Sequence, residues 1–142
     1  MATLFTRIID GEIPGRFVWR DDQAVAFLTI APITPGHTLV VPRAEVDHWL
    51  DLDRELASYL MQVSQAVGQA QMAVFKPERV GLIVAGLEVP HCHIHVLPID
   101  SEADLSLARA NPNPDPVAHD DAAERLRGAL RDQGHGDLVP DA

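Results

Sequence analysis

Three histidines at alternate positions, His91, His93 and His95, are the residues of this chain best suited to chemistry. Histidine has an unperturbed pKa near neutrality, so its ring can act as base, acid or nucleophile at cellular pH. The residues that separate them are apolar, and strict alternation predicts a strand whose successive side chains lie on opposite faces. We therefore expect all three imidazoles on one face, while the apolar residues fill a core.

The row has three interpretations. The first is a metal site, because imidazole suits zinc and similar ions. A strand rises about 3.3 Å per residue, which separates the outer two histidines by about 13 Å. Zinc–nitrogen bonds are only about 2 Å long, so one ion could take two neighbours but not all three. The second interpretation is a catalytic array, in which one imidazole attacks and its neighbours orient and protonate; the third is a solvated strand.

Length and composition limit the class of protein. The 142 residues predict a single domain with a medium-sized core, and 46% hydrophobic residues are usual for a globular protein. The single cysteine, Cys92, excludes an internal disulfide and a zinc site built on cysteines. A net charge of −10 argues against nucleic-acid binding, which needs a basic surface. No apolar run is long enough for a membrane span, and residues 1–15 lack a signal pattern, so we expect a cytoplasmic protein.

Periodicity predicts the elements that must position the histidines. Residues 3–9 form a short helix with Thr3 as its cap, and a stripe from Leu52 to Val74 indicates a long helix. The runs that predict strands are residues 16–20, 24–30, 37–41, 79–85 and 92–97. This order is typical of an α+β domain.

The last part of the chain is acidic and differs from the rest. Residues 111–116 repeat Asn or Asp with Pro and predict an extended spacer, followed by a helix near 118–132. That helix has only Leu126 and Leu130 as large apolar residues, so it either packs on the body or docks on a partner subunit. We expect a mobile tail from residue 134. The domain division is therefore 1–105 and 106–142. Three further histidines, predicted on the surface, are His48, His119 and His135.

Four ordered stretches resemble the histidine triad (HIT) family of nucleotide hydrolases and transferases. The stretches are residues 5–14, 26–32, 35–42 and 91–98. The resemblance covers about residues 3–100 and implies a HIT-like α+β fold with an antiparallel sheet of about five strands over residues 1–105. It also implies a nucleotide as small-molecule partner and a homodimer, with no cofactor and no metal.

The resemblance implies a two-step reaction at the α-phosphate of a nucleotide derivative. His93 would attack phosphorus and form a nucleotidyl-histidine intermediate, which water would hydrolyse. The backbone carbonyl of His91 would fix the tautomer of His93, and His95 would hydrogen-bond the phosphate. His37 would support His91 from a neighbouring strand. The bond cleaved would be a P–N or P–O bond of a phosphoramidate-like or dinucleoside-polyphosphate-like compound.

Nucleotide-binding residues are carried over by their positions in the short helix, two strands and the loop before the triad. They are Phe5, Ile8, Phe27, Leu28, Thr29, Ile30, Leu39, Gly86, Leu87, Glu88 and Val89. Phe27 and Ile30 would sandwich the base. A plain core position is the alternative for most of the others, and an equal one for Leu4 and Leu39.

Two departures from the family pattern keep a second function open. Thr29 stands where the family's hydrolases carry an acidic residue for the ribose, and Leu87-Glu88 stands where they often have Gln and then Ser or Thr. Glu88 could replace that hydroxyl as proton donor only if burial raised its pKa. The alternative is therefore a nucleotide-binding or interaction protein of HIT fold with weak or lost catalysis.

Overall fold

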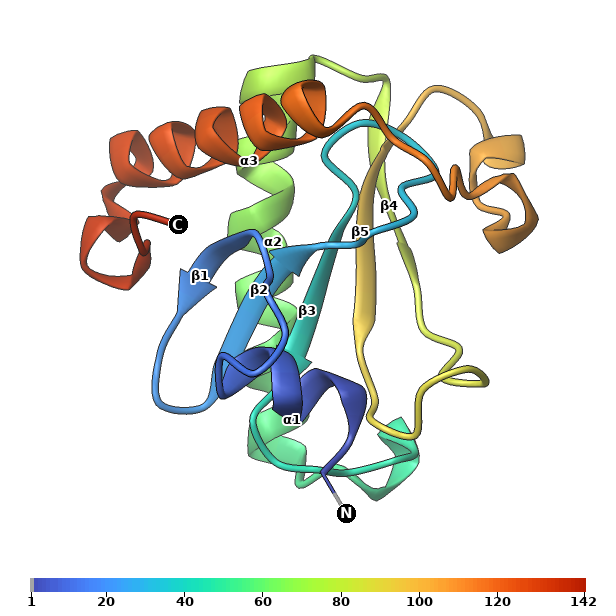
Figure 1. The fold of residues 1–142 in the computed structure, drawn as a ribbon, viewed down its shortest axis with the longest axis vertical. Helices are drawn as coiled ribbons and strands as arrows, with labels where there is room; N and C mark the ends of the chain where they lie inside the picture. Colours follow the sequence, from blue (N-terminus) through green and yellow to red (C-terminus); the bar gives the residue numbers. More distant parts are fainter. Residues whose placement is uncertain (1) are drawn as a thin grey trace.

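The computed structural model describes residues 2–142, which form one five-stranded antiparallel sheet with helices on both faces (Figure 1). The strand order is β1-β2-β3-β5-β4. The strands are β1 (Phe17–Arg20), β2 (Ala24–Leu28), β3 (Thr38–Pro42), β4 (Arg79–Ile83) and β5 (Ile94–Ile99). The predicted α+β architecture is confirmed. Within residues 2–142, no helix is both long enough and apolar enough to cross a bilayer.

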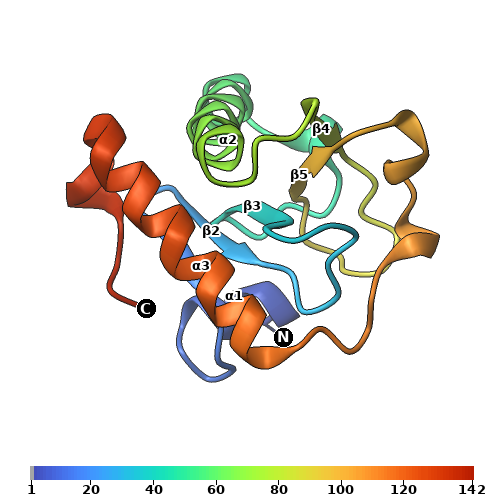
Figure 2. The same cartoon turned by 90° about the horizontal axis from the view of Figure 1, so that it is seen from above.

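Two helices cover opposite faces of the sheet (Figure 2). The long helix α2 (Arg54–Phe75) buries an apolar stripe that includes Leu60 and Val67, as its periodicity predicted. The short helix α1 (Leu4–Ile9) lies on the other face and buries Phe5 and Ile8. Because successive side chains of a strand lie on opposite faces, the sheet contributes to two separate apolar cores, one under each helix.

Strand β5 begins two residues later than predicted, at Ile94 rather than Cys92. The amide of Cys92 donates to the carbonyl of Val46 at 2.7 Å, and Val46 lies beyond the end of β3. His91 and His93 consequently precede the ladder, on the segment that leads into it. Strand β2 is also shorter than predicted and ends at Leu28.

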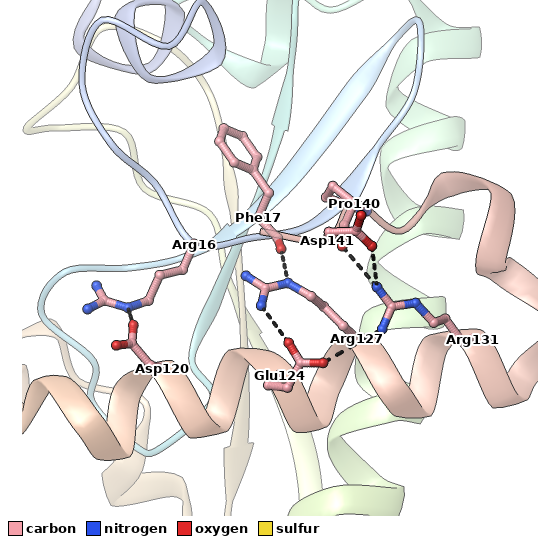
Figure 3. A network of polar contacts seen from close by, with 8 residues as sticks. All are labelled: Arg16, Phe17, Asp120, Glu124, Arg127, Arg131, Pro140 and Asp141. Carbon is pink, nitrogen blue, oxygen red and sulfur yellow. Dashed lines mark hydrogen bonds and ion pairs between the residues drawn. The ribbon is translucent and has the colours of Figure 1, made fainter.

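Helix α3 (Pro116–Leu130) packs on the body, against both α2 and β1, and crosses one end of the fold (Figure 1). Its Leu126 and Leu130 are fully buried, so the short apolar pair is enough to join the main core. The Nε of Arg127 donates to the carbonyl oxygen of Phe17 at 2.7 Å (Figure 3). The outer edge of β1 is thus covered by this helix.

The predicted mobile tail is packed in the structure. The chain continues in short helical turns to Leu138, and Val139 is buried in the core that α2 and α3 share. The guanidinium of Arg131 donates to the Pro140 carbonyl at 3.2 Å and lies 3.6 Å from the Asp141 carboxylate (Figure 3). The structure thus gives the end of the chain packed contacts, and the mobility expected from residue 134 stays a prediction.

Candidate active site

The ring of His93 is fixed by the backbone of His91, two residues earlier in the chain. Its Nδ1–H donates to the backbone carbonyl of His91 at 2.8 Å, and a carbonyl can only accept. The neutral ring then carries its proton on Nδ1 and keeps a free lone pair on Nε2. Burial lowers the pKa of His93 from 6.5, while the hydrogen bond to His91 and the charge of Glu88 act in the opposite direction. The geometry provides a neutral imidazole nitrogen able to attack.

His95 is oriented by His37, the residue that immediately precedes β3. The backbone amide of Ile33 donates to Nδ1 of His37 at 3.0 Å, so the proton of the neutral His37 ring lies on Nε2. That Nε2–H points at Nδ1 of His95, 2.9 Å away. The proton of His95 is therefore on its Nε2, where it can be donated to an anionic oxygen.

The role expected for His37 is corrected by this contact. The resemblance implied that it supports His91, but the structure joins it to His95. Strand register is the reason: Leu39 of β3 lies opposite His95 of β5, and His37 is two residues from Leu39 on the same face. His91 lies beyond the last residue pair of that ladder.

Both members of the His37–His95 pair are held neutral. Burial, followed by the neighbouring His95 and His93, lowers the pKa of His37 from 6.5 to about 3. Burial, followed by His93, lowers the pKa of His95 to about 4. A neutral pair can keep the donor–acceptor direction described above at neutral and mildly acidic pH.

His91 is completely buried and held at both ring nitrogens. Its Nε2 lies 2.7 Å from the carbonyl oxygen of Pro42, and its Nδ1 lies 2.7 Å from the hydroxyl of Thr3. Thr3 was predicted only as a helix cap. Its partner is 88 residues away, so no local sequence pattern could have identified the contact.

An apolar cluster, largely buried, adjoins the histidines on the α1 side of the sheet. The predicted nucleotide-binding residues that the structure brings together there are Phe5, Ile8, Phe27, Leu39 and Val89. Phe5 packs edge-on against His93, with ring centroids 4.8 Å apart, and against Phe27 at 5.6 Å. The nucleophilic ring is thus continuous with an aromatic cluster in which Phe5 is 4% and Phe27 3% exposed.

Other predicted residues lie elsewhere. The side chain of Leu28 belongs to the core under α2, on the opposite face from Phe27, so its predicted place in the nucleoside pocket was wrong. Ile30 is 77% exposed and lines a groove of about 760 Å³ between the 14–16 turn and α3. Thr29 lies beside it, and its hydroxyl accepts from the amide of Ala31 at 3.2 Å.

Of the three histidines predicted on the surface, His119 is buried instead. It is 5% exposed, and its Nε2 lies 2.9 Å from the carbonyl of Thr29. Burial is the main reason that its pKa lies below 6.5. Helix α3 therefore fixes the turn that follows β2. His48 is exposed as predicted, whereas His135 is half-buried against Trp19.

The loop between β4 and β5 carries the remaining predicted residues. Gly86 adopts φ +81°, a conformation that favours glycine, and Leu87 is 96% exposed. Glu88 is exposed as well, so the burial required for its role as proton donor is not met in this chain. Its carboxylate is nevertheless near enough to raise the pKa of His93.

A reactive thiol and a metal site are the two other chemistries to consider near the triad. Cys92 is a free thiol, 3% exposed, and burial raises its pKa. A buried thiol with a raised pKa is a poor nucleophile. Within residues 2–142, no group of three or more His, Cys, Asp or Glu side chains is arranged to hold a metal ion.

The fold and the histidine row together define a histidine triad protein, and comparisons with known proteins agree. A family model of the HIT domain matches residues 10–102. An uncharacterised HIT-like protein of Saccharolobus solfataricus is 34% identical over 97 residues, which are 65% of this chain and 70% of the relative. The protein Hit of Bacillus subtilis is 33% identical over 99 residues, 65% of this chain and 67% of the relative.

Solved structures extend the similarity beyond the residues that the family model matches. A zinc-bound histidine triad family protein of Mycobacterium smegmatis is 25% identical, with a TM-score of 0.82 over 96% of this chain and 98% of its own. A HIT family hydrolase of Legionella pneumophila is 29% identical, with a TM-score of 0.57 over 68% of this chain and 91% of its own. This chain belongs to the HIT family, whose members are nucleotide hydrolases and transferases.

The neutral His37–His95 pair predicts a pH-dependent stability. Their folded pKa values, about 3 and about 4, lie below the unfolded value of 6.5, so unfolding takes up protons below pH 6.5. The stability they contribute is present above pH 6.5 and is lost as the pH falls toward the folded values. Each group contributes a slope of up to about 1.4 kcal/mol per pH unit.

We expect the free energy of unfolding in urea to fall between about pH 6.5 and pH 5. His37→Gln retains a donor toward His95 but has no titrating ring, so its stability should fall less steeply than that of the wild type. The matched control is His48→Gln, which changes an exposed histidine and should keep the wild-type slope. Equal slopes for the wild type and His37→Gln would contradict the neutral burial of His37.

Proposed function

We propose that the protein is a nucleotide hydrolase that transfers a nucleotidyl group to His93 and then to water. The bond cleaved is a P–N or P–O bond at the α-phosphate of a phosphoramidate-like or dinucleoside-polyphosphate-like nucleotide. The observation that carries the proposal is the hydrogen bond from Nδ1 of His93 to the carbonyl of His91, which leaves Nε2 free to attack. Family membership supports the reaction class.

In the first step, Nε2 of His93 forms a bond to the α-phosphorus as the bond to the leaving group breaks. Charge develops on the non-bridging oxygens, and the Nε2–H of His95 is a suitable donor for it. The His93 ring stays paired with the carbonyl of His91 while its charge rises. The leaving group departs with the bonding electrons and takes its proton from water.

In the second step, water attacks the same phosphorus and the P–N bond to His93 breaks. The products are a mononucleotide and the free imidazole, so the enzyme returns to its starting state. Phosphoryl-type transfer depends on positioning and charge stabilisation more than on covalent assistance. The His37–His95 pair and the buried His91 supply a rigid mount of this kind.

The nucleoside would lie on the α1 face. Phe5 contacts His93 directly and Phe27 follows it, so a base placed on this cluster would hold its phosphate toward Nε2. Gly86 and Val89 border the phosphate position, on the loop that leads into the triad. Ile30 borders the outer end, where the groove beside α3 gives room for a larger substituent.

The central test is His93→Ala with a nucleoside phosphoramidate and a dinucleoside polyphosphate as substrates. We expect the rate of mononucleotide release to fall by on the order of 1,000-fold or more, because no nucleophile remains. The wild type, quenched in acid-free denaturant, should carry a labelled nucleotide on His93. The matched control, His48→Ala, removes an exposed histidine and should retain wild-type turnover. Equal rates in the wild type and His93→Ala would exclude this function, and nucleotide binding without turnover would favour the binding-protein alternative.

The role of Glu88 can be tested by the pH dependence of kcat/KM. Its charge raises the pKa of His93, so Glu88→Gln should move the acid limb of the profile to lower pH. The reason is that kcat/KM falls as the pH drops through the pKa of the nucleophile. If Glu88 were instead the proton donor, its loss would lower kcat at all pH values and remove the basic limb of the pH profile.

We also propose that the protein is a homodimer formed along β4. This strand is an edge of the sheet, and unpaired backbone groups at an edge favour pairing with another chain. Exposed apolar side chains gather in and after it: Leu82 is 39% exposed, Val84 42% and Leu87 96%. Such a patch on a small protein is typical of an interaction surface.

Sedimentation should therefore give a particle of twice the 15.5 kDa chain mass. Leu82→Glu places a charge on the proposed interface and should yield monomers. Val117 is 75% exposed on α3, so Val117→Glu is a matched control that should remain dimeric. A monomeric wild type would contradict the proposal.

A further inference from the structure

We propose that Thr3 is a positioning residue for the triad: its hydroxyl hydrogen-bonds Nδ1 of His91 and thereby sets the carbonyl that orients His93. This inference rests on the proposed function for its effect on turnover. The hydroxyl lies 2.7 Å from Nδ1, and the His91 ring is fully buried. Thr3 itself is half-buried at the start of α1.

The direction of the hydrogen bond follows from the other side of the ring. Nε2 of His91 lies 2.7 Å from the carbonyl of Pro42, which can only accept, so the proton of the neutral ring is on Nε2. Nδ1 then needs a donor, because an unpaired buried nitrogen is costly. The Thr3 hydroxyl at 2.7 Å is a donor at the right distance.

The Thr3 hydroxyl has two acceptors within reach of its proton, Nδ1 of His91 at 2.7 Å and the hydroxyl of Thr6 at 3.2 Å, and the contact to His91 is the shorter one. The Thr3 oxygen accepts from the amide of Thr6 as the N-cap of α1, and its own amide donates to Glu45 at 2.9 Å. The hydroxyl of Thr6 bonds Glu45, and this contact, followed by the Thr3 amide, lowers the pKa of Glu45. An ionised carboxylate thus fixes the backbone at Thr3.

Three contacts then run in series from a helix to the nucleophile. Thr3 holds the ring of His91, the Pro42 carbonyl holds its other side, and the His91 carbonyl holds His93. The same helix carries Phe5, which packs on both histidine rings at 5.7 Å and 4.8 Å. A shift of α1 would therefore change the position of Nε2 of His93.

Three substitutions separate the hydroxyl's donor role from its cap role. Thr3→Ser keeps both, Thr3→Asp keeps the cap but has no proton to donate, and Thr3→Val loses both. We expect Thr3→Ser to remain within about 2-fold of the wild-type kcat, and the other two to lose about 10-fold with KM changed less than about 2-fold. Arg7 is 51% exposed on the same helix and pairs with Glu12, so Arg7→Gln is the matched control and should keep wild-type kcat.

A second measurement, nitrogen-15 NMR of the imidazole rings, does not depend on turnover. The wild type should show a protonated Nε2 and a hydrogen-bonded, unprotonated Nδ1 at His91. The Nδ1 resonance should move to that of a free lone pair in Thr3→Val and to a protonated nitrogen in Thr3→Asp. Unchanged His91 resonances in both, or a Thr3→Ser enzyme as slow as Thr3→Val, would overturn the proposal. If His93→Ala proves as active as the wild type, the proposed function fails, and the resonances alone decide whether Thr3 orients His91.

Discussion

The hydrogen bond between Nδ1 of His93 and the carbonyl of His91 is the contact on which the rest of the site depends. Its two partners are only two residues apart, so no second helix or strand is needed to form it. Its direction, however, depends on the backbone at His91 being held still. The buried ring of His91, gripped between α1 and the end of β3, provides that fixation.

A second constraint is the cost of burying charge. Four histidines are buried in one small region: His37, His91, His93 and His95. A protonated ring there would lack the water that stabilises its charge. The backbone fixes the rings by hydrogen bonds: the amide of Ile33 donates to Nδ1 of His37, which requires that nitrogen to be unprotonated, and the carbonyl of His91 accepts from Nδ1 of His93. Neutral rings with defined tautomers give each nitrogen a single role, which free histidines on a solvated strand would lack.

Much of this arrangement follows from local sequence. The alternation of His91, His93 and His95 predicted a common face, and the stripe of α2 predicted its buried side. Contacts between distant segments could not be predicted in the same way. The pairing of His37 with His95 depends on strand register, and the burial of His119 depends on where α3 docks. The start of β5 was misplaced because alternation continues through His91 and Cys92, although tertiary contacts draw that segment off the ladder.

The two edge strands of the sheet differ: α3 packs on β1, whereas, in the part of the chain that the structure describes, β4 has no strand on its outer side. This difference limits how copies of the chain could associate. Arg127 of α3 occupies the free carbonyl at the β1 edge, so an incoming strand would have to displace a packed helix. Growth of the sheet is thus possible in one direction only. In the proposed dimer, the β4 edges of both copies would be occupied, and the β1 edge of each copy would remain covered by α3. Assembly through strand edges would therefore stop at a closed pair and would not continue into an open filament.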